Sequence, residues 1–259
     1  MDQINVALVL LATKHEFYQG QVDTCLTNYI DVCPPGVNID IIVCMNTHVD
    51  NSLSKYSNNQ HVNSVTVHDC DIPGEQDVYI QNNKQPEIKQ ELGQSNGPNQ
   101  LFYRSFEHLK TKSYDYYMVI ECDTRPVIDN WMPRLQHYCQ ENDFIIAGSR
   151  YKGKQKLPDK DWTGHLNGVA IYKNCDMLHE VLNGSRELLN HYIHVKHYVM
   201  LNYDIAIWYY VNQSGFDKYL NMLIDTNIIS NYSLPCDKST DIQTILSQQP
   251  DTIILHQKQ

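Results

Sequence analysis

Short apolar runs alternate along this chain with segments in which apolar residues recur at helical spacing, and this alternation limits the possible folds most strongly. A run such as residues 6–12 predicts a strand buried on both faces, as in parallel sheets. The runs expected to form strands are residues 6–12, 39–45, 62–67, 115–121, 144–147, 166–172 and 252–255. The segments expected to form helices are residues 21–32, 101–109, 131–139, 177–189 and 204–211. This order predicts a single α/β domain with crossover connections between strands.

Charge and cysteine content restrict the partners and the compartment. Thirty acidic against twenty basic residues give a formal net charge of −10, which argues against a nucleic-acid partner because phosphate binding needs clustered Lys and Arg. The eight cysteines include no C-x-x-C pair, so we expect mostly buried free thiols and a reducing compartment. The sequence has no apolar run of the ~18 residues that a membrane span needs, and its first residues lack the features of a signal peptide. We therefore expect a soluble, cytoplasmic protein.

Residues 69–98 differ from the rest of the chain, because Asp, Asn, Gln, Lys, Pro and Gly dominate there and apolar residues are isolated. A loop of this length within a compact domain is either a functional lid or poorly ordered. The composition leaves both interpretations open.

The sharpest local motif is Glu121-Cys122-Asp123, at the carboxyl end of the most strand-like run. In a strand, residues i and i+2 point to the same side, so both carboxylates are expected to face one point. Ligands of open α/β sheets bind outside the carboxyl ends of strands, where two carboxylates suit Mn²⁺ or Mg²⁺ shared with phosphate groups. On these residues alone a solvated strand end is the stronger interpretation, because short acidic motifs often match by chance.

Four segments, taken in order, give that motif a context. They are Gly97-Pro-Asn-Gln-Leu-Phe-Tyr103 before the acidic strand, His165-Leu-Asn-Gly168, Asn202-Tyr-Asp-Ile-Ala-Ile-Trp208, and Ile254-Leu-His256. Their order resembles the glycosyltransferases of the GT-A fold, and within that fold the small cytosolic enzymes of large DNA viruses and algae. The resemblance runs from about residue 4 to the end of the chain. It implies a GT-A-like mixed, mostly parallel sheet flanked by helices, with residues 1–125 binding the nucleotide sugar and residues 126–259 facing the acceptor.

The resemblance also implies a role for individual residues on the donor side. Asp123 and His256 would bind the metal ion, Mn²⁺ or Mg²⁺. Glu121 stands where the family pattern usually has Asp, so it would touch the metal, a bridging water or the ribose. For His256 an exposed histidine near a frayed terminus is an equal alternative. The residues expected around the nucleotide sugar are Thr13, Glu16, Asn99, Arg104, Glu121, Cys122 and Asp123.

On the acceptor side, an inverting transfer requires a general base that takes the proton of the attacking hydroxyl. Asp204 is the first candidate and Asp161 the second. A helix N-cap is an equally weighted alternative for Asp204. The residues expected to contact the sugar are Trp162, His165, Asn167 and Gly168.

These features together predict a metal-dependent hexosyl- or pentosyltransferase that moves a sugar from a nucleotide diphosphate donor, with a UDP-sugar favoured, to a hydroxyl of a glycan acceptor. A non-catalytic carbohydrate or nucleotide-sugar binding module on the same fold is the alternative. A sugar-nucleotide pyrophosphorylase ranks last, because its Gly- and Arg-rich loop after the first strand is replaced by Thr13-Lys14-His15-Glu16-Phe17. The sequence leaves the sugar, the linkage, the stereochemistry and the oligomeric state open.

Overall fold

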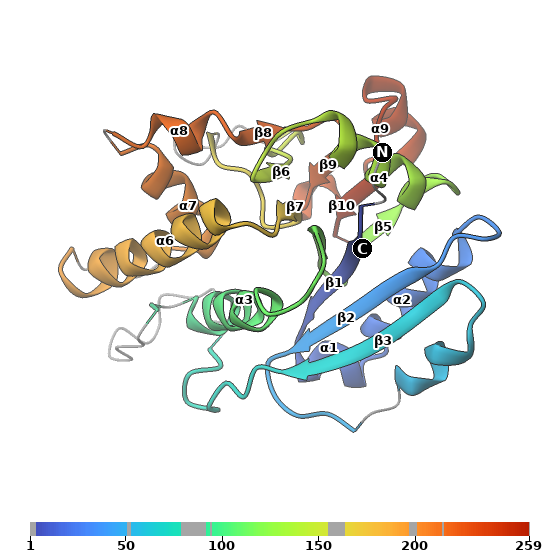
Figure 1. Ribbon diagram of the computed structural model, residues 1–259, viewed down its shortest axis with the longest axis horizontal. Coiled ribbons are helices and arrows are strands. Elements are labelled where there is room, and N and C mark those ends of the chain that lie inside the picture. Colours follow the sequence, from blue (N-terminus) through green and yellow to red (C-terminus); the bar gives the residue numbers. More distant parts are fainter. Residues whose placement is uncertain are drawn as a thin grey trace.

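The computed structural model describes residues 4–50, 53–78, 92–93, 95–154, 164–196, 201–213 and 215–258. Its central sheet has seven strands in the order β3-β2-β1-β4-β7-β6-β8 (Figure 1). These strands are β1 (Val6–Ala12), β2 (Ile39–Met45), β3 (Val62–Asp69), β4 (Tyr116–Ile120), β6 (Ile146–Gly148), β7 (Ala170–Lys173) and β8 (Leu223–Asp225). Every neighbouring pair is parallel except those that β7 makes with β4 and β6. The predicted mixed, mostly parallel α/β sheet is confirmed.

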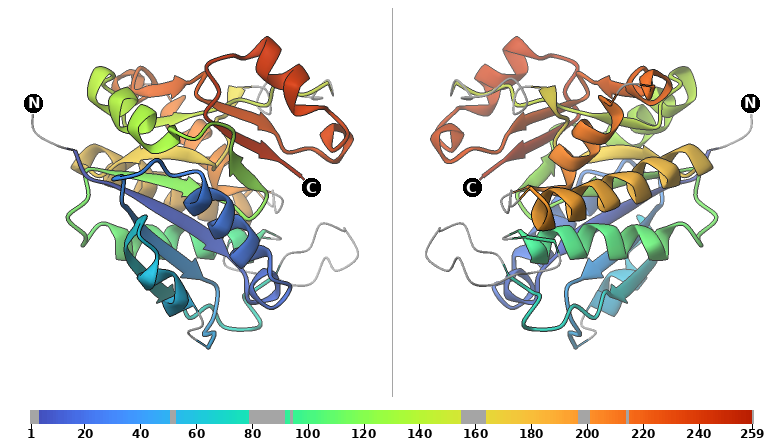
Figure 2. Two further views of the ribbon diagram at one scale, coloured as in Figure 1. Left: turned by 90° about the vertical axis from the view of Figure 1, so that its right-hand side faces the viewer. Right: turned by 90° about the vertical axis from the view of Figure 1, so that its left-hand side faces the viewer.

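Helices cover both faces of this sheet, which explains why its inner strands are mostly apolar. On one face, Leu8 and Leu10 pack with residues of α2 (Gln21–Asp31) and α4 (Trp131–Glu141). On the other face, Val9 packs with residues of three more helices. These are α3 (Asn96–Leu109), α6 (Asp176–His194) and α7 (Tyr203–Val211). Figure 2 shows α2 in front of the sheet in its left view and α6 with α3 in front in its right view.

A second, three-stranded sheet joins the middle of the chain to its end. It consists of β5 (Thr124–Pro126), β10 (Ile254–Gln257) and β9 (Ile229–Tyr232), with β10 in the centre. Figure 1 shows β5, in green, beside β9 and β10, in red. Strand β10 is antiparallel to β5 and parallel to β9. This sheet brings the last described residues next to the segment that follows β4.

The remaining elements are short. They are α1 (Lys14–Tyr18), η1 (Leu53–Asn58), α8 (Asp217–Leu220), η2 (Pro235–Asp237) and α9 (Ile242–Gln248). All eight cysteines are free thiols and five of them are buried, as expected. Within the described part of the chain, no helix is long and apolar enough to cross a membrane.

Several predicted boundaries differ from the structure. The segment after β1, which none of the expected helices covers, is the short helix α1, because Thr13 and Glu16 cap it reciprocally. Strand β7 begins at Ala170 rather than at residue 166, because the Asn167 side chain accepts a hydrogen bond from the Val169 N–H in a turn. The last strand includes His256, which was expected just beyond its end.

The interpretations of residues 69–98 remain predictions. Residues 79–91 and 94 lie outside the described residues. The end of the segment is helical, because α3 already begins at Asn96.

Asn99 has a different role from the predicted contact with the base or ribose. Its side chain is fully buried in α3. Its Nδ2 donates to the carbonyl oxygens of Leu92 (3.0 Å) and Leu201 (2.9 Å), and its Oδ1 accepts from the Tyr203 N–H (2.8 Å). All of these partners are backbone groups, so the amide holds the start of α7 against α3.

Replacing Asn99 by alanine is therefore expected to lower the free energy of unfolding by about 2–4 kcal/mol, because buried peptide groups lose their partners. Urea denaturation measures this loss. The matched control is Asn63→Ala, which removes an exposed bond to Asp40 and should cost under ~0.5 kcal/mol. Equal losses in both variants, or an Asn99→Ala protein of full stability with weakened nucleotide binding, would contradict the structural role.

Candidate active site

A large cleft among the described residues lies beyond the carboxyl ends of β1, β2 and β4. This is the point where the strand order reverses, since β2 lies on one side of β1 and β4 on the other. The cleft has a volume of about 1110 Å³. Its lining includes residues after β1 (Thr13, Lys14, His15, Glu16), after β2 (Asn46, Thr47), after β4 (Glu121, Cys122, Asp123), and from later segments (Asp77, Pro98, Leu101, Tyr203, Lys238, Lys258). Most of the lining residues carry polar or charged side chains.

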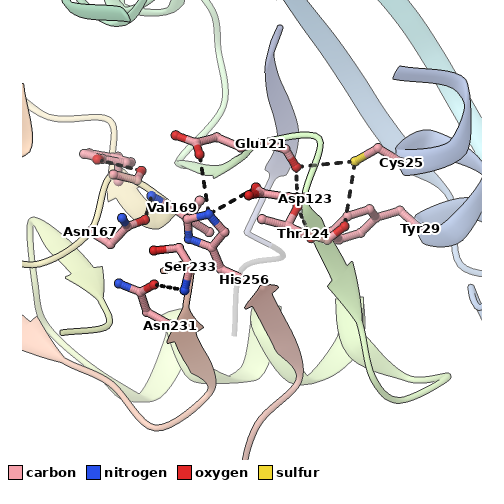
Figure 3. Close-up of polar contacts among 12 residues, drawn as sticks. Cys25, Tyr29, Glu121, Asp123, Thr124, Asn167, Val169, Asn231, Ser233 and His256 are labelled. Carbon is pink, nitrogen blue, oxygen red and sulfur yellow. Dashed lines mark hydrogen bonds and ion pairs between the residues drawn. The ribbon is translucent and has the colours of Figure 1, made fainter. Parts of the chain in front are cut away.

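Three ionisable side chains meet at the edge of this cleft. The Nε2 atom of His256 lies 3.1 Å from Asp123 Oδ1 and 3.5 Å from Glu121 Oε2. Figure 3 shows the three side chains pointing toward one another. The His256 side chain is buried, whereas those of Asp123 and Glu121 are 25% and 40% exposed. The ring therefore forms the inner wall of the cluster and the carboxylates face the cleft.

A tight turn after β4 sets the position of the two carboxylates. Strand β4 ends at Ile120, so Glu121 and Asp123 converge through this turn and not through the strand alternation that the sequence suggested. The buried Thr124 closes the turn, because both its N–H (3.0 Å) and its hydroxyl (2.7 Å) donate to the Glu121 carbonyl oxygen. The Tyr29 hydroxyl of α2 in turn donates to the Thr124 Oγ1 atom. The turn is thus fixed from the core side.

Strand pairing brings His256 to this turn from the other end of the chain. In the antiparallel pair of β5 and β10, His256 lies opposite Thr124. The next residue, Gln257, donates its backbone N–H to the Asp123 carbonyl oxygen (3.1 Å). An exposed, frayed histidine is therefore the wrong interpretation of His256, because the residue is held in a paired and buried strand.

Opposite charges shift the pKa values within the cluster. Burial alone would lower the pKa of His256, but its contacts with Asp123 and Glu121 outweigh burial and raise it to about 10. Burial would raise the pKa of Asp123, yet the imidazolium and Lys258 hold it below its ordinary value. In the metal-free protein His256 is thus protonated at neutral pH, and the ion pair is lost as the pH rises through about 10.

The cluster has the composition and size of a divalent cation site. Ligand atoms of all three side chains lie within 4.8 Å of one another. Two ligands at right angles around a cation at about 2.1 Å lie about 3 Å apart, close to the 3.1 Å between His256 Nε2 and Asp123 Oδ1. Asp123 Oδ1 is buried and accepts no hydrogen bond from the described residues. The two carboxylates suit hard divalent cations such as Mn²⁺ and Mg²⁺, and the imidazole is a ligand that transition-metal ions accept.

The residues expected on the nucleotide side separate into two groups. Thr13, Glu16 and Cys122 line the cleft. Burial raises the pKa of Glu16, its bonds to Thr13 oppose this rise, and the charges of Glu121 and Asp123 add to it. Arg104 is not among the residues that line the cleft. Its guanidinium donates instead to the carbonyl oxygens of Cys70 (3.0 Å) and Asp71 (2.9 Å). Its role here is to fix the segment after β3.

Other cleft residues were absent from the predicted set. Asn46 follows β2 and accepts the Lys14 N–H at 2.7 Å, while its Nδ2 donates to Asp77. The position of Asn46 after an apolar strand was an available signal for it. Lys258, two residues after His256, could be expected near the diphosphate from the resemblance, with a solvated terminal lysine as the alternative, whereas Lys238 had no comparable signal because it lies in a separate segment.

Asp204, the first candidate for the general base, lies in the first turn of α7. Asn202 is the N-cap of that helix, so the capping interpretation of Asp204 is wrong. Its Oδ2 atom lies 3.6 Å from His165 Nε2, and both side chains are nearly buried. Burial raises the pKa of Asp204, while His165 opposes and the nearby Glu121 reinforces that rise. Asp204 therefore lies near the cluster of Glu121, Asp123 and His256, and its charged form is less favoured than in an exposed aspartate.

Asn167 and Gly168 belong to the turn that precedes β7, in which the Asn167 side chain accepts the Val169 N–H (Figure 3). Asn167 lines a small hollow together with Asp204 and Trp208. A Cβ atom on Gly168 would lie 1.9 Å from the Tyr203 hydroxyl, so the glycine makes room for that ring at the edge of the cleft. The other predicted acceptor residues, Asp161 and Trp162, lie outside the described residues.

Comparison with known proteins supports the fold. No protein-family profile matches the sequence, and no curated protein sequence matches it. Among solved structures, apo mouse xyloside xylosyltransferase 1 has a TM-score of 0.56 at 9% identity, over 98% of this chain and 97% of that one. The bifunctional glycosyltransferase WbbM gives 0.53 at 14% identity, over 99% and 46% of the two chains. Apo GlyE of Streptococcus pneumoniae gives 0.54 at 12% identity, over 97% and 54%.

These neighbours are all glycosyltransferases, and the fold of this chain is GT-A-like, as the sequence resemblance implied. The chain spans almost the whole length of the mouse protein and about half the length of the WbbM and GlyE chains. At such low sequence identities, the similarity to these structures shows a shared fold and nothing further.

The raised pKa of His256 predicts how metal affinity depends on pH. A metal ion must displace the proton from the imidazolium, so the affinity for Mn²⁺ should rise about tenfold per pH unit from pH 6.5 to 8.5. Titration calorimetry at several pH values measures this slope. In a His256→Gln variant the slope should almost vanish while weaker binding remains. A wild-type affinity that stays flat over the same range would refute metal binding by His256.

Proposed function

We propose that this protein is a metal-dependent glycosyltransferase that moves a hexose or pentose from a nucleotide diphosphate donor to a hydroxyl of a glycan acceptor. A UDP-sugar is the favoured donor. The observation that carries the proposal is the convergence of Glu121, Asp123 and His256 on the cleft at the switch point of a GT-A-like sheet.

In the proposed donor site, each of the cleft residues has its own role. Asp123 and His256 bind the cation, Mn²⁺ or Mg²⁺, and Glu121 contacts the cation, a bridging water or the ribose. When bound, such an ion neutralises negative charge on the diphosphate as it leaves. Thr13 and Glu16 form the wall of the nucleotide pocket, and Cys122 lies between the two acidic residues. Residues 1–125 supply most of this donor site, and His256 completes it from the C-terminal half.

The acceptor is proposed to enter beside Asp204. In an inverting transfer its carboxylate takes the proton of the attacking hydroxyl, and its raised pKa suits a base that works near neutral pH. His165 orients that carboxylate from 3.6 Å. Asn167 and Gly168 are proposed to contact the acceptor sugar, together with Asp161 and Trp162 of the preceding segment.

Thermal unfolding with a panel of nucleotides tests the donor. A ligand at about a hundred times its Kd stabilises the native state by ~2.7 kcal/mol, which raises Tm by ~5–10 °C for a domain of this size. We expect this rise with UDP and Mn²⁺, its loss in EDTA, and its loss in Asp123→Asn. The control variant Asp251→Asn, on the exposed surface, should respond as the wild type does.

An unchanged Tm with UDP, GDP, CMP and dTDP would contradict the proposed function. The similarity to glycosyltransferases would then concern the fold alone. A rise with UDP and Mn²⁺ without any turnover of UDP-sugars would favour the non-catalytic binding module instead.

The Asp204→Asn variant tests the proposed base. We expect turnover to fall by about 10² or more, because the amide cannot accept the proton, while the affinity for UDP with Mn²⁺ stays within about twofold. Steady-state kinetics on a transferred UDP-sugar and calorimetry give the two numbers. Unchanged turnover would exclude Asp204 as the base and agree with a retaining reaction, which requires none.

A further inference from the structure

The Tyr203 side chain, at the start of α7, lines the cleft although most of its surface is buried. Its ring stacks on that of Phe102 in α3, with the ring centroids 3.8 Å apart and the planes 9° from parallel. The Gly168 backbone approaches its hydroxyl so closely that no Cβ atom would fit between them. The Asn99 side chain accepts its backbone N–H at 2.8 Å. The ring and the backbone of Tyr203 are therefore both held in one position.

The Tyr203 hydroxyl has no hydrogen-bond partner in the part of the chain that the structure describes. Two buried tyrosines nearby differ in this respect. The Tyr172 hydroxyl donates to the Gly168 carbonyl oxygen (3.0 Å), and the Tyr103 hydroxyl shares a hydrogen bond with Ser185 Oγ (3.1 Å). The Tyr203 hydroxyl is also not sealed in the core. Because polar groups of buried side chains are almost always bonded, a free hydroxyl on a cleft is available to a ligand.

This hydroxyl lies near both halves of the candidate site. Burial raises the pKa of Tyr203, and the charges of Glu121 and Asp204 add to this rise. Glu121 belongs to the metal cluster, and Asp204 is the candidate base. The phenol is therefore protonated at neutral pH, and it can donate a hydrogen bond as well as accept one.

The order of the reacting groups indicates which ligand this hydroxyl meets. In a glycosyl transfer, the sugar lies between the leaving diphosphate and the acceptor hydroxyl that attacks its anomeric carbon. Under the proposed function, the diphosphate lies at the cation of Asp123 and the acceptor hydroxyl at Asp204. A side chain that is close to both halves therefore borders the transferred sugar, whose hydroxyl groups match the phenol as donors and acceptors.

We propose that Tyr203 is a specificity-determining residue of the donor site, whose hydroxyl hydrogen-bonds a hydroxyl group of the transferred sugar. This inference rests on the proposed function, because it names a contact of the same donor site.

The Tyr203→Phe variant tests this contact, because it keeps the stacked ring and removes only the hydroxyl. The probes are UDP-glucose, UDP-galactose, UDP-N-acetylglucosamine and UDP-xylose, each with Mn²⁺. On the donor that the wild type turns over fastest, kcat/KM should fall about tenfold, as expected for one lost hydrogen bond. The Kd for UDP with Mn²⁺, measured by calorimetry, should stay within about twofold, since UDP lacks the transferred sugar.

Deoxy analogues of that UDP-sugar identify the bonded hydroxyl group. For one analogue, kcat/KM of the wild type should fall about tenfold below that of the parent donor, because Tyr203 then lacks its partner. The same analogue should cost Tyr203→Phe little, since the bond is already missing.

The matched control is Tyr103→Phe, which removes the hydroxyl of a buried tyrosine that does not line the cleft. It loses the bond to Ser185, so Tm should fall by ~2–4 °C, while kcat/KM stays at the wild-type value. Tyr203→Phe should show the reverse pattern. Its Tm should stay within about 1 °C of the wild type, because no protein group loses a partner.

The possible failures are distinguishable. If the wild type binds no UDP with Mn²⁺, or turns over none of these UDP-sugars, the proposed function itself is wrong and the role of Tyr203 falls with it. If the wild type turns over a donor and Tyr203→Phe does so equally well, only the role of Tyr203 is overturned. An equal loss of affinity for UDP would place the hydroxyl at the nucleotide, and a Tm as low as that of Tyr103→Phe would assign it to the fold. Either result would contradict a contact with the sugar.

Discussion

The pairing of β5 with β10 is the interaction on which the candidate site depends. Strand β5 begins one residue after Asp123, and its pairing places His256 opposite Thr124. The hydrogen bond from the Gln257 N–H to the Asp123 carbonyl oxygen extends this pairing into the acidic turn. Without it, the two carboxylates would remain on a solvated turn after β4, which is a common feature of α/β sheets. With it, the turn gains a buried imidazole 3.1 Å from one carboxylate.

The same pairing explains how the protein tolerates so many charged groups at one place. Burying a charge is costly unless a partner offsets it. In the metal-free protein the proton on His256 supplies one positive charge beside Asp123 and Glu121. Under the proposed function this proton gives way to the cation, so that a positive charge stays beside Asp123 and Glu121 in both states.

The long apolar strands could be predicted from the sequence. A strand that is buried on both faces needs a continuous run of apolar residues, whereas a half-exposed strand or an amphipathic helix does not. Strands β1 and β2 match their predicted bounds. Asp123 in the middle of the chain and His256 near its end were expected in one metal site, and their side chains lie 3.1 Å apart. Strands β5 and β9 have three and four residues. Elements this short carry no periodic pattern, and their existence depends on tertiary pairing. The second sheet was therefore missed.

The misassigned polar residues have a related cause. Asn99 and Arg104 lie on α3 close to the cleft, and the sequence placed both at the nucleotide. Their side chains instead hydrogen-bond to backbone groups of distant segments, Leu201 and Tyr203 for Asn99 and Asp71 for Arg104. Whether a buried polar side chain serves a ligand or a backbone group depends on which loop packs over it, and no local pattern carries that information. The turn that carries Lys238 depends on a distant residue in the same way. The Gln257 side chain donates to the Asp237 carbonyl oxygen and holds this turn, which the neighbouring sequence does not indicate.

Anomalous scattering from crystals grown with Mn²⁺ and UDP tests the central claim most directly. We expect one strong manganese peak within about 2.3 Å of a carboxylate oxygen of Asp123 and of His256 Nε2, with the diphosphate of UDP completing the coordination. A manganese peak elsewhere on the protein, or no ordered ion beside Asp123 and His256, would contradict the account.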